Sequence, residues 1–353
     1  MFSLMINKRI LNFFDTVNCI YKLQHWFKLV HFTCRPLFGF TKTIRIISMN
    51  SGKKSLKDFG YSFNEAGQLK NIITNEPFVF DVYNGNRKKN QQHYEQLGEI
   101  IDEHIYKLLE EDTKLIKVII PLDCSNNEGC SFIFQSEDAM SAEKVLLLIH
   151  GSGVVRAGQW SRRLIINHSL EAGSQLPYIK KGAELGFGIF VLNSNYNYDQ
   201  NTKTSIRGSE TPNDHFDYVW KQIISRSNAK HVAIVAHSYG GVITVEGALN
   251  NPEMVDKTFV VALTDSVHHL SPQDNRLNLW MKTNVRNWVS SNAELDKVLS
   301  YRDIDCPRYS AGTPVHEETS WKAFDSVWNF IESKWEDRIN NKRTIQQKEE
   351  KDL

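Results

Sequence analysis

Residues 231–241, HVAIVAHSYGG, constrain the fold more than any other part of this sequence. They have the pattern of a buried strand that runs directly into Ser238 and then into a helix. The turn between strand and helix is so tight that the two backbones nearly touch, which explains the small residues Ala236 and Gly240 around the serine. This G-x-S-x-G-like pattern, with alanine in its first position, predicts that Ser238 is the nucleophile of a nucleophile elbow.

The rest of the chain alternates apolar strand-like runs with amphipathic helical segments. The strand-like runs are residues 117–122, 131–134, 145–149, 188–192, 231–236 and 259–263. The helical segments are residues 91–112, 177–185, 214–225, 242–249 and 321–335, with a hairpin at 61–73. Such alternation predicts an α/β fold with a mostly parallel sheet and helices on both faces. Because no helix separates the first two strands, we expect an antiparallel N-terminal edge, and the elbow makes the fold α/β-hydrolase-like.

Composition divides the chain into three parts. Residues 1–57 form a basic extension in which Asp15 is the one acid of the first 50 positions and apolar residues recur near helical spacing. This leader resembles an organelle-targeting or membrane-surface segment; disorder, or an isoform extension before Met49, are the alternatives. Residues 58–337 are the expected α/β-hydrolase-like domain, and residues 338–353 are an expected polar, disordered tail. No apolar run reaches the roughly 18 residues that would indicate a transmembrane helix.

Charge and cysteine content argue against several classes of function. A formal net charge of +1 gives the chain no global attraction to nucleic acid. The 5 cysteines are scattered without a C-x-x-C pair, so we expect free thiols in a reducing compartment rather than a disulfide framework or a zinc site. His237, His268 and His269 have no carboxylate at ligand spacing in the sequence, so they are expected to line a site without a metal, and no cofactor is predicted.

Two further segments have more ordinary expected roles. Residues 194–213 are polar and rich in turn formers, which indicates a long loop where such folds often carry a lid or an insertion. Arg156, Arg162 and Arg163 surround Trp160 in the sequence. Binding of an anion or a partner is one interpretation of these arginines, and a solvated helix face is the expected one.

Two segments supply the other groups of a serine-hydrolase site. Residues 150–153 (HGSG) directly follow a buried strand, the place of the loop that donates a backbone N–H to the oxyanion hole. The expected donors are Ser152 or Gly153 together with Tyr239, and a plain strand-ending turn is the alternative. His316, in a loop before the last helix, is the expected general base, with a surface histidine as the alternative.

The acid of the site is the least constrained member. Asp265 follows the strand FVVAL and lies between the nucleophile and the base in chain order, as this fold requires. A carboxylate at the carboxyl end of a parallel strand points into the site crevice, so Asp265 is favoured. Asp296, Asp303 and Asp305 remain alternatives one strand later, and a turn-capping role for Asp265 also stays open.

At HGSGVVRAGQW, AHSYGG, ALTDSVH and SAGTPVHEETSW the sequence resembles the Argonaute-binding-protein-two family, whose animal members are described as cotranscriptional regulators. The resemblance covers roughly residues 58–335. It implies an α/β-hydrolase-like fold and links to Argonaute proteins, small-RNA-directed heterochromatin and alternative splicing, through protein contacts at chromatin in the nucleus and also in the cytoplasm. A related domain ends some histone deacetylases, and the family's proposed nucleophile corresponds to Ser238. The loop at 194–213 is short where relatives carry a long charged insertion.

Two functions from different classes follow. The first is a regulator of gene expression that uses the hydrolase fold as a scaffold for protein contacts. The second is an active serine hydrolase, an esterase, thioesterase or amidase, in which Ser238 attacks a carbonyl, His316 moves the proton and Asp265 orients the imidazolium. The intact serine, histidine and glycines favour the second, because a scaffold needs none of them. Direct nucleic-acid binding is disfavoured, because the globular part has no basic stripe and no RNA-binding signature.

Overall fold

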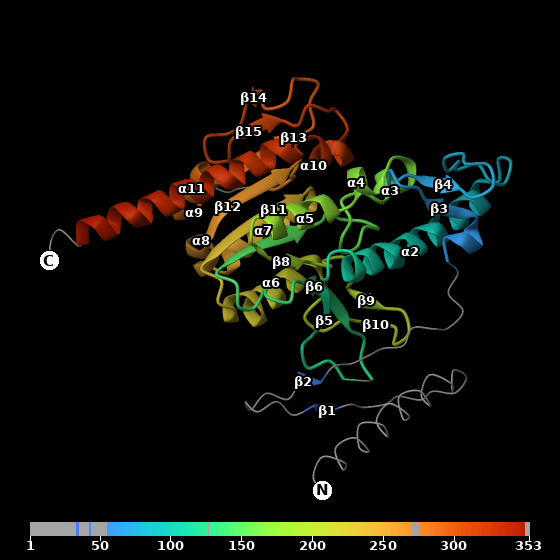
Figure 1. Ribbon diagram of the computed structural model, residues 1–353, viewed down its shortest axis with the longest axis horizontal. Coiled ribbons are helices and arrows are strands. Elements are labelled where there is room, and N and C mark those ends of the chain that lie inside the picture. Colours follow the sequence, from blue (N-terminus) through green and yellow to red (C-terminus); the bar gives the residue numbers. More distant parts are fainter. Residues whose placement is uncertain (1–32, 35–41, 44–54, 126, 270–274, 350–353) are drawn as a thin grey trace, which may run out of the picture. The chain divides into compact units, whose positions relative to one another are not determined.

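The computed structural model describes residues 33–34, 42–43, 55–125, 127–269 and 275–349 (Figure 1). The chain divides into two compact units, Met1–Lys53 and Lys54–Leu353. In the first unit, β1 (Thr33–Cys34) pairs antiparallel with β2 (Lys42–Thr43). The amphipathic leader, read above as a targeting or membrane-surface segment, lies outside the described residues apart from these strands. Within the described ranges, no helix is long and apolar enough to cross a bilayer.

Nine strands of the second unit form its central sheet, in the order β14-β15-β13-β12-β11-β7-β8-β6-β5. The neighbours from β8 to β15 are parallel, whereas β5, β6 and β14 pair antiparallel. The predicted fold class, a mostly parallel sheet with an antiparallel N-terminal edge, is therefore confirmed. The strands are β5 (Ile116–Ile120), β6 (Ser131–Gln135), β7 (Lys144–Ile149), β8 (Gly188–Val191), β11 (His231–His237), β12 (Thr258–Thr264), β13 (Val285–Val289), β14 (Val298–Leu299) and β15 (Arg308–Ser310).

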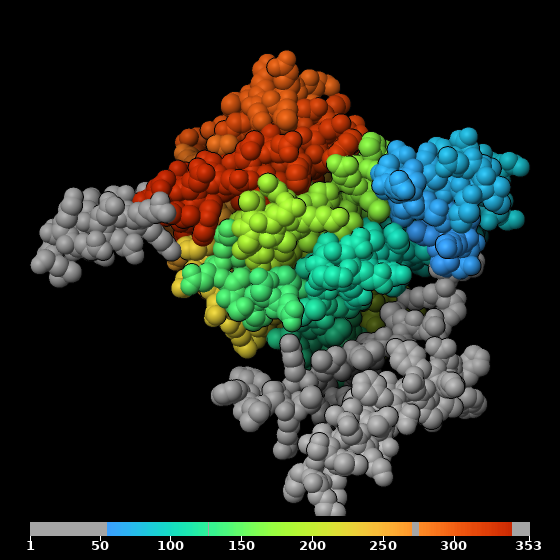
Figure 2. All heavy atoms as spheres, in the orientation of Figure 1, coloured from blue at the N-terminus to red at the C-terminus, as the bar shows by residue number. Residues whose placement is uncertain are grey.

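Helices cover both faces of this sheet, and β7 shows why its sequence is a continuous apolar run. Leu146 and Leu148 enter one core, whereas Leu147 and Ile149, on the opposite face of the strand, enter a second core. Figure 2 shows the helices over the first core side by side in red, yellow-green and teal. They are α11 (Phe324–Glu349), α5 (Leu176–Glu184) and α2 (Arg87–Glu111). Over the second core lie α6 (Pro212–Gln222), α7 (Tyr239–Asn250), α8 (Glu253–Lys257) and α9 (Asn275–Asn284).

Short elements complete the second unit. The predicted hairpin is present, with Tyr61 of β3 opposite Asn71 of β4. The loop expected at 194–213 contains a small hairpin of its own, β9 with β10. The short elements are β3 (Tyr61–Phe63), β4 (Leu69–Asn71), β9 (Tyr198–Asp199), β10 (Thr204–Ser205), α3 (Arg162–Asn167), α4 (Leu170–Gly173), α10 (Thr319–Lys322), and the 3-10 helices η1 (Lys57–Phe59), η2 (Ile224–Arg226) and η3 (His316–Glu318).

The polar tail differs from the expectation of a disordered segment after residue 337. Helix α11 continues to Glu349. Trp335 packs against the ring of Phe259 at a centroid distance of 5.4 Å, and Arg338 Nε donates to His231 Nδ1 at 2.8 Å. These contacts hold the helix on the domain at the expected boundary, and the helix continues beyond them.

The cysteines also differ from the expectation. Cys124 and Cys130 form a disulfide in the connection between β5 and β6, so free thiols are the wrong prediction for this pair. The antiparallel pairing of the two strands brings the ends of their connection together, which a search for C-x-x-C spacing does not detect. Cys306 is a free, buried thiol, as expected.

Candidate active site

Ser238 lies on the tight turn between β11 and α7. Its backbone has φ 53° and ψ −118°, in the positive-φ range that residues with a side chain rarely adopt. A Cβ atom placed on Gly240 would lie 2.6 Å from the carbonyl oxygen of Ile149, closer than real Cβ contacts come. Helix α7 therefore touches the end of β7 through a glycine, and the turn leaves Ser238 partly exposed at the carboxyl edge of the sheet.

The loop after β7 lies directly against Ser238. A Cβ atom placed on Gly151 would lie 3.0 Å from the Cβ of Ser238, so this glycine allows the close approach. Gly153 has φ 100°, which glycine adopts without strain. Ser152 and Gly153 are exposed on the loop, and Tyr239 is the first residue of α7. The role of these three residues as oxyanion donors stays a prediction.

Asn195 and His150 hold this loop, and the sequence patterns predict no such role for either. Asn195 Nδ2 donates to the carbonyl oxygens of Gly151 at 2.9 Å and of Val155 at 3.1 Å. His150 Nδ1 donates to the same Gly151 oxygen at 2.8 Å. Burial lowers the pKa of His150 to about 4, so its ring is neutral at pH 7. Asn195 follows β8 at the carboxyl edge of the sheet, and that position is the signal that could have identified it.

Asp265 and His316 meet across 51 positions of sequence: His316 Nδ1 lies 2.7 Å from Asp265 Oδ2. Burial opposes the charge on Asp265, but hydrogen bonds from His316 and Ser290 outweigh it and lower the pKa of the carboxyl. The hydrogen bond to Asp265 also outweighs burial at His316 and raises the pKa of the imidazole. Because Nδ1–H donates to the carboxylate, Nε2 is the acceptor of the neutral ring, as a general base requires.

The link from Ser238 to His316 is less direct. Among the described residues, no hydrogen bond joins the Ser238 hydroxyl to His316. His237, the residue before the serine, packs against the His316 ring with centroids 4.7 Å apart, so the imidazole lies beside the elbow. In enzymes without bound substrate such hydrogen bonds are often long and tighten only when substrate binds. The serine-to-histidine step therefore remains a proposal.

The three alternative acids have partners elsewhere. Asp296 accepts from a tryptophan ring N–H at 2.7 Å, and Asp303 pairs with a lysine on the surface at 2.9 Å. Asp305 pairs with a histidine other than His316, also at 2.9 Å. Asp265 is thus the carboxylate that contacts the expected base.

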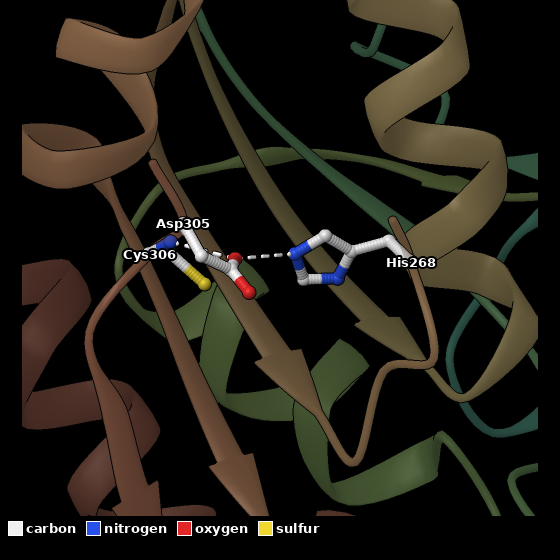
Figure 3. A group of neighbouring side chains, drawn as sticks. All are labelled: His268, Asp305 and Cys306. Carbon is white, nitrogen blue, oxygen red and sulfur yellow. Dashed lines mark hydrogen bonds and ion pairs between the residues drawn. The ribbon is translucent and has the colours of Figure 1, made fainter. Parts of the chain in front are cut away.

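His268 lies beside Asp305 and Cys306, as Figure 3 shows. Asp305 Oδ1 is 2.9 Å from His268 Nε2, so a carboxylate that is distant in the sequence contacts this histidine in the fold. Asp305 lies 37 positions away, which spacing along the sequence cannot reveal. Oδ1 also accepts from the Cys306 amide, and Oδ2 accepts from Arg308. Both carboxylate oxygens therefore accept hydrogen bonds, and the cluster forms a buried hydrogen-bond network; the absence of a metal here stays a prediction.

Arg162 is buried, which corrects the expectation of a solvated helix face. Its guanidinium pairs with Asp102 of α2 at 2.8 Å, with 8% and 13% of the two side chains exposed. It also donates to the carbonyl oxygen of Val154, and Gln159 donates to Asp102, both at 2.7 Å. These contacts fasten the segment that leads from the loop after β7 into α3. The partner lies 60 positions away in sequence, so charge spacing along one helix could not predict it.

Comparisons with known proteins agree on one family. A family model described as the Arb2 domain matches residues 53–295. A cotranscriptional regulator ARB2A homolog from Gallus gallus is 43% identical, over 78% of this chain and 80% of its own length. Cotranscriptional regulator ARB2A of Homo sapiens is 41% identical, again over 78% of this chain and 80% of its own length. A homolog from Dictyostelium discoideum is 35% identical, over 79% of each chain.

Solved structures resemble the chain more distantly. A histone deacetylase from Saccharomyces cerevisiae superposes with a TM-score of 0.49 at 16% identity, over 68% of this chain and 98% of that one. An esterase from Pyrococcus furiosus superposes with a TM-score of 0.39 at 9% identity, over 64% of this chain and 93% of that one. Similarities at this level say nothing about activity.

Proposed function

This chain belongs to the Arb2 domain family, and from that premise we propose that it is a cotranscriptional regulator that acts through protein–protein contacts. The observation that carries the proposal is the 41–43% identity to regulators of that name over most of the chain. The partners are Argonaute and chromatin proteins, and the processes are small-RNA-directed heterochromatin formation and alternative splicing. The site of action is the nucleus, with a further pool in the cytoplasm. A formal net charge of +1 supports contact through proteins rather than through nucleic acid.

Recovery of an Argonaute protein with the tagged full chain tests this role. We expect recovery in a mild buffer of about 0.15 M salt and after nuclease treatment, because the contacts are between proteins. The Ser238→Ala variant is the matched control, and it should recover the same amount if the fold serves as a scaffold. Failure to recover Argonaute under these conditions, with the chain itself folded and abundant, would contradict the proposal.

A second candidate function is serine hydrolysis of an acyl ester, thioester or amide. It is favoured by the strained Ser238 backbone together with the 2.7 Å contact between His316 and Asp265. Ser238 Oγ attacks the carbonyl carbon while His316 Nε2 takes the hydroxyl proton, and the leaving group departs with that proton. Water then attacks the acyl-serine by the same route. Asp265 stabilises the imidazolium, and backbone amides of Tyr239 and of Ser152 or Gly153 hold the oxyanion.

A fluorophosphonate probe tests the second function. We expect labelling to map to Ser238 and to disappear in Ser238→Ala. The pKa of His316 is raised by Asp265, and only the neutral ring accepts the serine proton. The labelling rate should therefore rise with pH, with a midpoint above the ordinary histidine value of about 6.5. Absence of labelling on folded protein, or a rate independent of pH between about 5 and 9, would exclude this mechanism.

A further inference from the structure

The turn that carries Asp265 is strained and needs support. Asp265 has φ 49°, a left-handed conformation that residues with a side chain rarely adopt. Such a conformation persists only where the surrounding contacts fix it. Its amide donates to the carbonyl oxygen of Trp288 at 2.7 Å. The side-chain amide of Asn287 makes two hydrogen bonds with the backbone of the next residue, Ser266. Asn287 Oδ1 accepts from the Ser266 N–H at 3.1 Å, and Asn287 Nδ2 donates to the Ser266 carbonyl oxygen at 3.2 Å.

A second support reaches the same turn from the cluster in Figure 3. Ser266 Oγ lies 2.8 Å from His268 Nδ1. On the other side of the ring, His268 Nε2 lies 2.9 Å from Asp305 Oδ1 (Figure 3). The His268 and Asp305 side chains are 1% and 8% exposed. Asp305 is fixed in turn by the Cys306 amide at 2.7 Å and by Arg308 at 3.0 Å. A continuous chain of hydrogen bonds therefore runs from the start of β15 to the residue after Asp265.

The charge on Asp305 fixes the direction of its hydrogen bond with His268. Burial opposes ionisation of Asp305, but His268, the Cys306 amide and Arg308 together lower its pKa to about 2. An ionised Asp305 only accepts, so His268 Nε2–H must donate to it. His268 Nδ1, on the other side of the ring, forms the hydrogen bond with the Ser266 hydroxyl. These hydrogen bonds fix the Ser266 hydroxyl oxygen in place beside Asp265.

Ser266 also contacts the helix that follows the nucleophile. A Cβ atom placed on Gly241 would lie 1.9 Å from Ser266 Oγ, so α7 and the acid turn touch at this point. Movement of Ser266 would thus disturb both Asp265 and the first turn of α7.

We propose that His268 and Asp305 are positioning residues that hold the Thr264–Ser266 turn so that Asp265 stays directed at His316. The catalytic consequence rests on the proposed serine hydrolase. The contact between Asp265 and His316 does not, and it can be measured in a protein without activity.

The experiment is an NMR titration of His316 in the full chain, with fluorophosphonate labelling in parallel. The groups that act on His316 are Asp265, Glu317 and the neighbouring His237, and Arg163 pairs with Glu317. The variants are Ser266→Ala, which removes one hydroxyl, and His268→Leu, which removes both ring contacts. His269→Leu is the matched control, because this exposed neighbour lies outside the chain of hydrogen bonds.

In both variants we expect the pKa of His316 to fall by about half a unit or more as Asp265 loses its orientation. Labelling of Ser238 should slow by about tenfold or more, since small misplacements have large effects on rate. His269→Leu should match the wild type in both measurements. If His268→Leu does not fold, Ser266→Ala decides the question.

Three results distinguish failure of the positioning role from failure of the proposed hydrolase. Wild-type titration of His316 in folded Ser266→Ala and His268→Leu would overturn the inference. One equivalent of tightly bound zinc, lost in His268→Leu, would also overturn it, because His268, Asp305 and Cys306 would then be ligands. An unlabelled wild type whose His316 pKa still falls in both variants would reject the hydrolase and support the positioning role.

Discussion

Replacement of His316 by alanine is expected to slow fluorophosphonate labelling of Ser238 by about 10⁴-fold. A serine hydroxyl is a weak nucleophile until a base takes its proton. His316 is the expected base, and its Nδ1 is hydrogen-bonded to the Asp265 carboxylate. Asp265→Asn should have an effect of similar size. The asparagine amide can hold the His316 ring in the tautomer that carries its proton on Nε2. In that tautomer Nε2 cannot accept the serine proton, and the neutral amide cannot stabilise the imidazolium. The rate constants come from time courses of labelling on variants with wild-type thermal stability.

The control for these two variants is Asp303→Asn. The sequence allows Asp303 as an alternative to Asp265 for the acid of the site, but the Asp303 side chain is 97% exposed and pairs with Lys282. The labelling rate of this variant should equal that of the wild type. If Asp303→Asn slows labelling while Asp265→Asn does not, the assignment of the acid is wrong. If neither His316→Ala nor Asp265→Asn has an effect, the probe reacts by a route that does not use this pair.

The sequence predicted those parts of the fold that are governed by local patterns. The elbow was predictable because a tight strand-to-helix turn demands small residues beside Ser238, and Gly240 meets that demand through its contact with Ile149. The buried strands were predictable because both faces of the sheet are covered. By contrast, the bounds of β13 and β15 could not be predicted, since β13 (VRNWV) carries Arg286 and Asn287 and β15 has 3 residues. Arg286 lies over the Phe330 ring at 4.2 Å, a contact that periodicity does not encode.

Residues whose roles depend on distant partners could not be predicted. Chain order allowed four acids, and the fold distinguished them by bringing Asp265 to His316. His268 showed no carboxylate at ligand spacing because Asp305 reaches it only through the order of strands in the sheet. Arg162 had the sequence context of a surface arginine, and its burial depends on a carboxylate of another helix. In each case the role of the side chain depends on a tertiary contact that the local sequence does not specify.

The buried pair of Arg162 and Asp102 leads to the largest expected loss of stability. Burial raises the pKa of Asp102 even though Arg162 lies 2.8 Å away, so the intact pair adds little net free energy of folding. Removal of one partner is a different matter, because it leaves a buried charge without compensation. Arg162→Met keeps most of the side-chain volume and is expected to lower the free energy of unfolding by about 3–5 kcal/mol at pH 7. Denaturant titrations followed by tryptophan fluorescence measure this change.

The pH dependence of that loss identifies its cause. Without Arg162 the pKa of Asp102 in the folded chain rises further above its unfolded value, so the folded state binds the proton more tightly. The penalty in Arg162→Met is therefore largest near pH 7 and shrinks as the pH falls toward about 4. Asp102→Leu combined with Arg162→Met should recover most of the lost stability, because no buried charge remains. Glu111→Gln, which breaks an exposed pair on the same helix, should change stability by less than about 0.5 kcal/mol. A loss in Arg162→Met that does not depend on pH would show that packing, and not the charge on Asp102, is what Arg162 supplies.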